Sequence, residues 1–344
     1  MEHAAIFAHN STFKEIVKEY AFPPSVYTAL SIVMAIFTSA SIILNGTVII
    51  VTLRHRQLRQ PLNYALVNLA AADLGSTLTG GLLSVVTNAK GYFWLGRKAC
   101  VFEGFSVAFF GIAALCTVAV IAVERMVVVC KPLGTVMFQT KHGATGLAIA
   151  WVWSLVWNTP PLFGWGSYQL EGVGTSCAPD WHSRDPANVS YILCYFFLCF
   201  AVPFVIIVVC YSRLLWTLRQ VARLGFVEGG AAAKAEARVG RMVVVMVLAF
   251  LVGWMPYACV SLAVIIDPEL HINPIIGTVP VYLAKSSTVY NPLIYIYMNR
   301  QFQGYAVPFL LCGRNPRALE EEGSEADTVV ATMNVKSSGK VSPM

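Results

Sequence analysis

Seven long apolar stretches, separated by short polar segments, divide this chain of 344 residues. An α-helix rises about 1.5 Å per residue, so roughly 20 apolar residues cross the hydrocarbon core of a bilayer. We therefore predict an all-α membrane protein built as a bundle of seven transmembrane helices. The predicted spans are residues 28–53, 62–86, 99–123, 143–163, 189–212, 242–266 and 272–299.

The composition agrees with a membrane protein. The chain is 57% hydrophobic and only 12% charged, with a mean hydropathy of +0.64, whereas a soluble domain carries about 25% charged residues. Within the predicted spans, only Asp73, Glu103 and Lys285 ionise near neutral pH. Charged groups are expensive in a membrane, so all three are candidate functional residues.

Positive charges predict the orientation. If the N-terminus is outside, most of the 24 Lys and Arg residues are cytoplasmic, as the positive-inside rule requires. The exceptions are Lys14, Lys18, Lys90, Arg97, Lys98, Arg184 and the membrane residue Lys285. The net charge of +6 follows from this bias, so we expect contact with lipid and no nucleic-acid partner. The first span is expected to serve as an uncleaved signal anchor.

The polar segments predict the domain organisation. The N-terminal segment offers Asn10 as a glycosylation acceptor, and Cys312 is a candidate palmitoylation site. The basic inner segment 213–241 is expected to be a loop offered to a partner. The predicted parts are an outer tail (1–25), a seven-transmembrane domain (26–299), an amphipathic eighth helix (300–312) and a disordered, phosphorylatable tail (313–344).

The predicted topology separates the nine cysteines by compartment. All but two lie within the predicted spans or at the cytoplasmic side. Cys100, at the outer end of the third span, and Cys177, in the second outer loop, are the only pair in the oxidising compartment. We therefore predict a disulfide between them.

Lys285 lies near the middle of the last span, roughly 20 Å along the helix from either end. An ammonium at that depth costs about 3 kcal/mol on insertion scales, and its side chain cannot reach the interface. Two interpretations remain open. The lysine makes a structural ion pair, or its desolvated amine condenses with a carbonyl as a Schiff base.

Six residues later comes Asn291-Pro292-Leu-Ile-Tyr295. The proline loosens the helix, and the asparagine offers hydrogen bonds to the carbonyls so released. The lysine and this motif together resemble the seventh helix of animal opsins, the retinal-binding branch of the rhodopsin-like G-protein-coupled receptors. Glu124-Arg125-Met126 resembles their Glu/Asp-Arg-Tyr triplet, with Met126 departing at the third place. The resemblance covers about residues 26–312.

The resemblance implies a chromophore and a switch. Light would isomerise 11-cis retinal on Lys285 to the all-trans form, with Glu103 and Glu171 as candidate counterions. Arg125 would exchange an inactive pairing with Glu124 and Glu236 for an active state. The implied retinal pocket is Ala108, Gly111, Phe200, Phe250, Trp254 and Tyr257. The other implied switch residues are Asn45, Asp73, Tyr211, Asn291, Pro292 and Tyr295.

Within the opsins, residues 108–116, 158–167 and 310–316 look like those of parapinopsins, a non-visual group of the pineal complex. This likeness implies an ultraviolet-absorbing, bistable pigment whose photoproduct pairs with Glu171. It also implies a Gi/Go/transducin-type G protein, a receptor kinase and arrestin at the C-terminal tail, and the plasma membrane of photoreceptor cells.

Three other classes share parts of this pattern. A retinal photoisomerase, which is an enzyme, needs Lys285 but not the cytoplasmic motifs. A receptor for a diffusible ligand needs those motifs but not the lysine. A microbial-type ion pump has the lysine but lacks both the disulfide loop and the inner motifs. The presence of all these features together favours a light-activated receptor over an enzyme.

Overall fold

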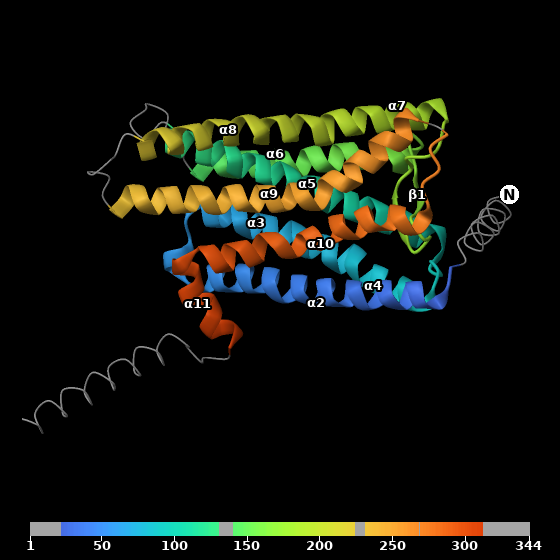
Figure 1. The fold of residues 1–344 in the computed structure, drawn as a ribbon, viewed down its shortest axis with the longest axis horizontal. Helices are drawn as coiled ribbons and strands as arrows, with labels where there is room; N and C mark the ends of the chain where they lie inside the picture. Colours follow the sequence, from blue (N-terminus) through green and yellow to red (C-terminus); the bar gives the residue numbers. More distant parts are fainter. Residues whose placement is uncertain (1–21, 131–139, 224–230, 268, 312–344) are drawn as a thin grey trace, which may run out of the picture.

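Most of each predicted apolar stretch is helical, and the resulting helical rods, some of them built from several helical segments, run side by side (Figure 1). The computed structural model describes residues 22–130, 140–223, 231–267 and 269–311. Helices satisfy their backbone hydrogen bonds internally, as lipid requires. The rods are α2 (Pro24–Arg54); α3, η2 and α4 (Pro61–Ser76, Thr77–Gly81 and Leu82–Lys90); α5 (Gly96–Cys130); α6 (Thr140–Asn158); α7, η4 and α8 (Pro186–Tyr195, Phe196–Ala201 and Val202–Arg223); α9 (Ala231–Ile266); and α10 (Pro274–Met298).

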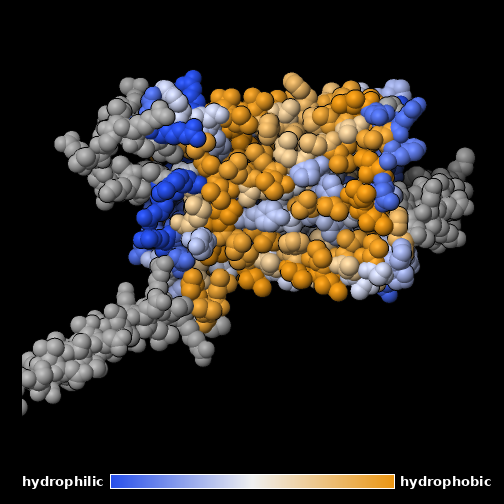
Figure 2. Space-filling model, viewed as in Figure 1, coloured by the Kyte–Doolittle hydropathy of each residue, from blue (hydrophilic) through white to orange (hydrophobic). Residues whose placement is uncertain are grey.

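The surface of the bundle is that of a membrane protein. Figure 2 shows a broad apolar belt across the middle of the face in view and hydrophilic residues at its two ends. Large apolar side chains such as Ile36, Phe197 and Val252 are exposed on this belt, which is typical of contact with lipid. In the described residues, five rods are long and apolar enough to cross a membrane by composition alone. The other two, α6 and α10, complete the predicted set of seven.

Two predicted boundaries were wrong. The fourth span was expected to continue to residue 163, but α6 ends at Asn158 and a short 3-10 helix follows (η3, Pro160–Phe163). Two consecutive prolines cannot donate the backbone bonds that would extend the α-helix. The inner segment 213–241 is also mostly helical, because α8 continues to Arg223 and α9 begins at Ala231. The alanine-rich start of α9 has a high helix propensity.

Helix α5 is central to the bundle. It packs against α3, α6 and α8 and contacts the outer hairpin. That hairpin joins β1 (Tyr168–Glu171) to β2 (Ser176–Pro179), with Leu170 opposite Cys177. Its turn needs Gly172, whose φ is +60° and where a Cβ would lie 2.4 Å from Thr278 Oγ1. The hairpin therefore lies tightly against the outer ends of the helices.

At the inner end the chain turns sharply into α11 (Arg300–Leu310), which leaves the bundle at an angle (Figure 1). Asn299 caps α11, because its Oδ1 accepts a 3.1 Å bond from the Phe302 amide. Phe302 and Ala306 are buried against the bundle, whereas Phe309 and Leu310 are exposed. A helix therefore follows the seventh span, and its amphipathic character stays a prediction.

Candidate functional site

The amine of Lys285, on α10, is buried inside the bundle and has a full set of partners. Its Nζ lies 3.0 Å from Glu103 Oε1, and the lysine side chain is only 7% exposed. Nζ also donates hydrogen bonds of 2.6 Å to Ser84 Oγ and to Ser176 Oγ. An ammonium has three protons to donate, so this cluster can hold a positive charge within the membrane.

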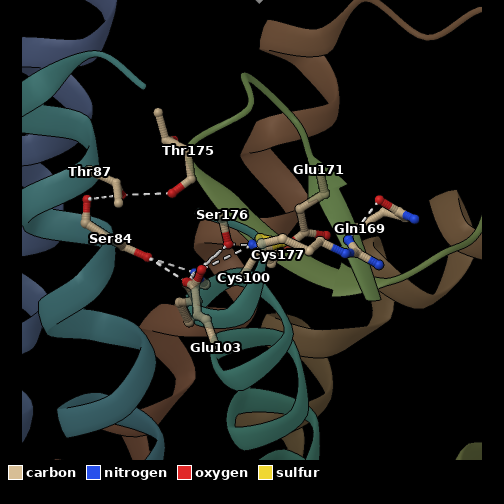
Figure 3. The surroundings of a disulfide bond; sticks show 11 residues. Ser84, Thr87, Cys100, Glu103, Gln169, Glu171, Thr175, Ser176 and Cys177 are labelled. Carbon is tan, nitrogen blue, oxygen red and sulfur yellow. Dashed lines mark hydrogen bonds and ion pairs between the residues drawn. A yellow bond between two sulfur atoms is a disulfide. The ribbon is translucent and has the colours of Figure 1, made fainter. Parts of the chain in front are cut away.

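Three elements converge on Glu103 (Figure 3). Its Oε2 accepts a 3.1 Å bond from the Cys177 amide of β2, and its Oε1 lies 3.4 Å from the hydroxyls of Ser84 and Ser176. Cys100, one turn earlier on α5, forms the predicted disulfide with Cys177. The disulfide thus keeps the amide donor of β2 against Glu103.

Glu171, the last residue of β1, belongs to the same cluster (Figure 3). Its Oε1 lies 3.3 Å from Ser176 Oγ, so one hydroxyl connects the two carboxylates. Its Oε2 accepts a 2.9 Å bond from the Tyr257 hydroxyl, whose oxygen accepts from Trp181 Nε1 at 2.8 Å. Burial raises the pKa of the Glu171 carboxyl, against the opposing effect of the Lys285 charge.

Sequence reasoning missed the hydroxyls and the indole that complete this cluster. Ser84, Ser176 and Trp181 are ordinary residues in the sequence, with no motif to mark them. Ser176 had one usable signal, since it precedes the bridged Cys177 and must lie wherever the disulfide places that cysteine. Nothing in the sequence indicates that Ser84 and Trp181 reach the site.

A large apolar cavity begins beside Lys285 and extends into the bundle, with an empty volume of about 1090 Å³. This volume includes open space at the mouth of the cavity, and the lining is mostly apolar, as is typical of ligand pockets in proteins. Glu171 also lines the cavity, and Glu103 is not among the lining residues. The lining includes all six residues expected of a retinal pocket: Ala108, Gly111, Phe200, Phe250, Trp254 and Tyr257.

The aromatic residues of α9 form one wall of this cavity. The rings of Phe250 and Trp254 are stacked with centroids 5.9 Å apart, and Tyr257 meets Trp254 edge-on at 6.4 Å. Trp254 Nε1 donates a 2.9 Å bond to Ser287 Oγ on α10. Gly111 allows the indole to lie against α5, because a Cβ there would be 2.9 Å from the Trp254 ring.

The predicted switch residues lie toward the opposite, inner end. Arg125 Nη2 pairs with Glu124 Oε1 at 2.9 Å, and both side chains are buried. Tyr211 is buried on α8. Glu236 belongs to α9, but its side chain lies outside the described residues, so its pairing with Arg125 stays a prediction.

A small cavity in the middle of the bundle brings together the remaining switch residues. Asn45 Nδ2 donates a 2.9 Å bond to the Thr288 carbonyl and so joins α2 to α10. The Tyr295 hydroxyl donates a 3.0 Å bond to Asn63 Oδ1 at the start of α3. The predicted residues that line this cavity are Asn45, Asp73, Asn291, Pro292 and Tyr295.

Two predicted modification sites cannot be placed. Asn10, the glycosylation acceptor, and Cys312, the candidate for palmitoylation, both lie outside the described residues. Both stay predictions.

The chain is similar to known proteins. Residues 44–295 match the family model of the 7 transmembrane receptor (rhodopsin family). The chain is 63% identical over 328 residues to parapinopsin of Ictalurus punctatus, covering 95% of this chain and 94% of that protein. It is 46% identical over 295 residues to pinopsin of Columba livia, covering 86% and 84%.

A solved structure agrees with these relatives. The crystal structure of squid rhodopsin matches with a TM-score of 0.77 and 30% sequence identity, covering 89% of this chain and 93% of that one. The relatives are opsin receptors rather than enzymes. The chain therefore belongs to the rhodopsin family of seven-transmembrane receptors and is a parapinopsin-like opsin.

Proposed function

We propose that this opsin is a bistable, ultraviolet-sensitive light receptor that holds 11-cis retinal on Lys285 and activates a Gi/Go/transducin-type G protein. Its family already implies a membrane receptor with a retinal chromophore and a heterotrimeric G protein. One observation carries the rest of the proposal. The amine of Lys285 is buried 3.0 Å from a carboxylate, at the edge of a large apolar cavity.

The residues present fit retinal. Its long apolar chain suits a cavity lined mainly by aromatic and small side chains, and its one aldehyde suits the lysine on that lining. Phe250, Trp254 and Tyr257 would contact the chain, and Gly111 leaves the indole room to do so. When bound through a Schiff base, retinal supplies the absorption of light and a change of shape from 11-cis to all-trans.

Two carboxylates compete for the single positive site at Lys285. Glu103 is the direct partner of the free amine, at 3.0 Å. Glu171 lies one hydroxyl away and lines the cavity itself. We infer that the dark pigment is unprotonated at the Lys285 nitrogen, and that Glu171 balances its charge after illumination. A stable, charged photoproduct would make the pigment bistable.

We further propose that the inner residues transmit the change. Glu124 holds Arg125 in the inactive state, together with Glu236. Tyr211, Asp73, Asn45 and the Asn291-Pro292…Tyr295 motif would rearrange when α9 and α10 move, because the prolines within those helices weaken their backbone bonding.

The proposal includes a topology and partners. The N-terminus, with glycosylated Asn10, would be extracellular, and residues 300–312, with Cys312 palmitoylated, would lie on the inner leaflet. The tail at 313–344 would bind a receptor kinase and arrestin. We place the receptor in the plasma membrane of photoreceptor cells. The charge distribution along the chain supports this orientation.

The test is light-dependent nucleotide exchange on a Gi-class G protein, measured with and without 11-cis retinal. We expect exchange only when retinal and light are both supplied. Exchange without retinal would indicate a receptor for another ligand. A light-driven change of the bound retinal without any exchange would indicate a photoisomerase.

A further inference from the structure

A small cavity adjoins Lys285 on the side of α2 and is separate from the carboxylate cluster. Its lining includes the lysine and four hydroxyl-bearing residues, whereas Glu103, Glu171 and Ser176 are not among the lining residues. The enclosed space has room for about one water molecule. The four hydroxyl-bearing residues are Thr38, Ser76, Thr77 and Thr288.

The backbone between α3 and α4 leaves the space for this cavity. The π-helix η2 replaces one turn of α-helix between α3 and α4, and such turns often occur at functional sites. It ends at Gly81, which has no side chain to fill the space. A Cβ on Gly81 would lie 2.9 Å from Thr38 Oγ1 and 3.5 Å from Thr77 Cγ2. The glycine therefore keeps the cavity open, and Thr38 Oγ1 is directed toward it.

The Thr38 hydroxyl is the second, independent observation. Thr38 is only 4% exposed, and its Oγ1 has no hydrogen-bond partner among the described residues. A buried hydroxyl without a partner is unfavourable, and native proteins commonly satisfy such groups with ordered water. The group thus points to a small polar ligand in the cavity.

The hydrogen-bond donors and acceptors that remain on the lining side chains indicate which ligand fits. Thr77 donates to the Asp73 carbonyl at 2.7 Å and its Oγ1 also lies 2.7 Å from Ser41 Oγ, while Thr288 donates to the Lys285 carbonyl at 3.1 Å. Their oxygens can therefore only accept further bonds, whereas the Thr38 hydroxyl can donate. A cation is disfavoured by the adjacent lysine, and an anion finds too few donors. A molecule that both donates and accepts fits this set.

We propose that this cavity is a binding site for one ordered water molecule, held by Thr38, Thr77 and Thr288 beside Lys285. Lys285 then lies between two polar sites. One is formed by the carboxylates at its amine, and the other is the water site on the side of α2. The water site does not depend on retinal, so it stands or fails separately from the proposed function.

Radiolytic hydroxyl-radical footprinting of the full-length, retinal-free protein in lipid nanodiscs tests the site. Radicals formed from a bound water oxidise the side chains next to it, even where bulk solvent is excluded. Met34 lines the cavity and is 2% exposed; Met242 is 1% exposed and lines none of the cavities described above. We expect Met34 to be oxidised several-fold faster than Met242. Equal rates would overturn the proposal without any variant being made.

Variants assign the effect to the hydroxyl. Thr38→Val removes the donor at nearly constant shape, and Gly81→Ala fills the space; each should lower the oxidation of Met34 to the rate of Met242. Thr47→Val is the matched control, because Thr47 is equally buried on α2 but bonds to its own helix at the Ile43 carbonyl. If Thr38→Val leaves Met34 as reactive as Thr47→Val does, the water is not held by Thr38 and the site is wrong.

Discussion

The outer and inner ends of this bundle hold their charges in different ways. At the outer end, Lys285 pairs directly with Glu103 and reaches Glu171 through the Ser176 hydroxyl, by bonds of 2.6 to 3.4 Å that connect α4, α5, α10 and the hairpin. The disulfide of Cys100 to Cys177 ties the hairpin to α5. At the inner end, Glu124 pairs with its own neighbour Arg125. Asn45, Asp73, Asn291, Pro292 and Tyr295 surround a small cavity between the two ends.

These two arrangements of charged residues suit the two ends to different roles. At the outer end, all three protons of the Lys285 ammonium are donated to hydrogen-bond acceptors, so the site is pre-organised. A chemical change at the lysine nitrogen therefore occurs among side chains that are already held in place. An ion pair between sequence neighbours does not tie two helices together. The proposed switch therefore depends on the predicted cross-helix partner Glu236, whose release would let α5 and α9 separate.

Replacing Lys285 should abolish the function of the outer end. Lys285→Ala removes the amine that would bind retinal, so we expect no retinal-dependent absorbance band after acid denaturation. Lys90→Ala, at an exposed lysine on α4, is the control and should keep the band. A normal band in Lys285→Ala protein would contradict the proposed attachment site and the interpretation built on it.

Breaking the disulfide should loosen the outer end as a whole. Cys177→Ser frees β2 from α5, and loss of a native disulfide typically costs about 2–5 kcal/mol of stability. We expect a large drop in folded yield and in thermal stability, measured on the purified pigment. Cys259→Ser, at an exposed free cysteine of α9, should have little effect. Wild-type yield from Cys177→Ser would show that the remaining hydrogen bonds suffice.

The two carboxylates should differ after illumination. Glu171→Gln removes the proposed partner of the charged photoproduct, so its absorption band should move from the visible toward the ultraviolet at neutral pH. Glu103→Gln should move it far less. Absorption spectra before and after irradiation measure both. The reverse order would make Glu103, the direct partner in this structure, the working counterion and would leave bistability without its mechanism.

The smallest effect is expected at the inner end. Glu124→Gln removes the charge that pairs with Arg125 at 2.9 Å, so the dark rate of nucleotide exchange should rise a few-fold. Glu236→Gln should act in the same direction if it is the cross-helix partner that the sequence predicts. If both variants fold normally and show no rise in nucleotide exchange in the dark, Arg125 is a structural charge. The carboxylates then do not stabilise the inactive state.

Much of this site was predictable because its residues are chemically unusual where they occur. A lysine, a glutamate and an aspartate stand out in apolar helices, and two cysteines alone share the outer compartment. The hydroxyls of Ser84 and Ser176 could not be predicted, since serine is common in helices and loops alike. They become part of the site only because the folded chain places them 2.6 Å from Lys285 Nζ.

Hydrophobic length and periodicity depend on local composition, so the number of helices, their order and the residues able to carry charge could be predicted from the sequence alone. Only the tertiary structure decided that the free amine pairs directly with Glu103 while Glu171 lies one hydroxyl away. It also decided that Gly81 and Thr38 enclose a polar space beside the same lysine. Such distances depend on how helices far apart in the chain pack together, and packing is a property of the whole bundle.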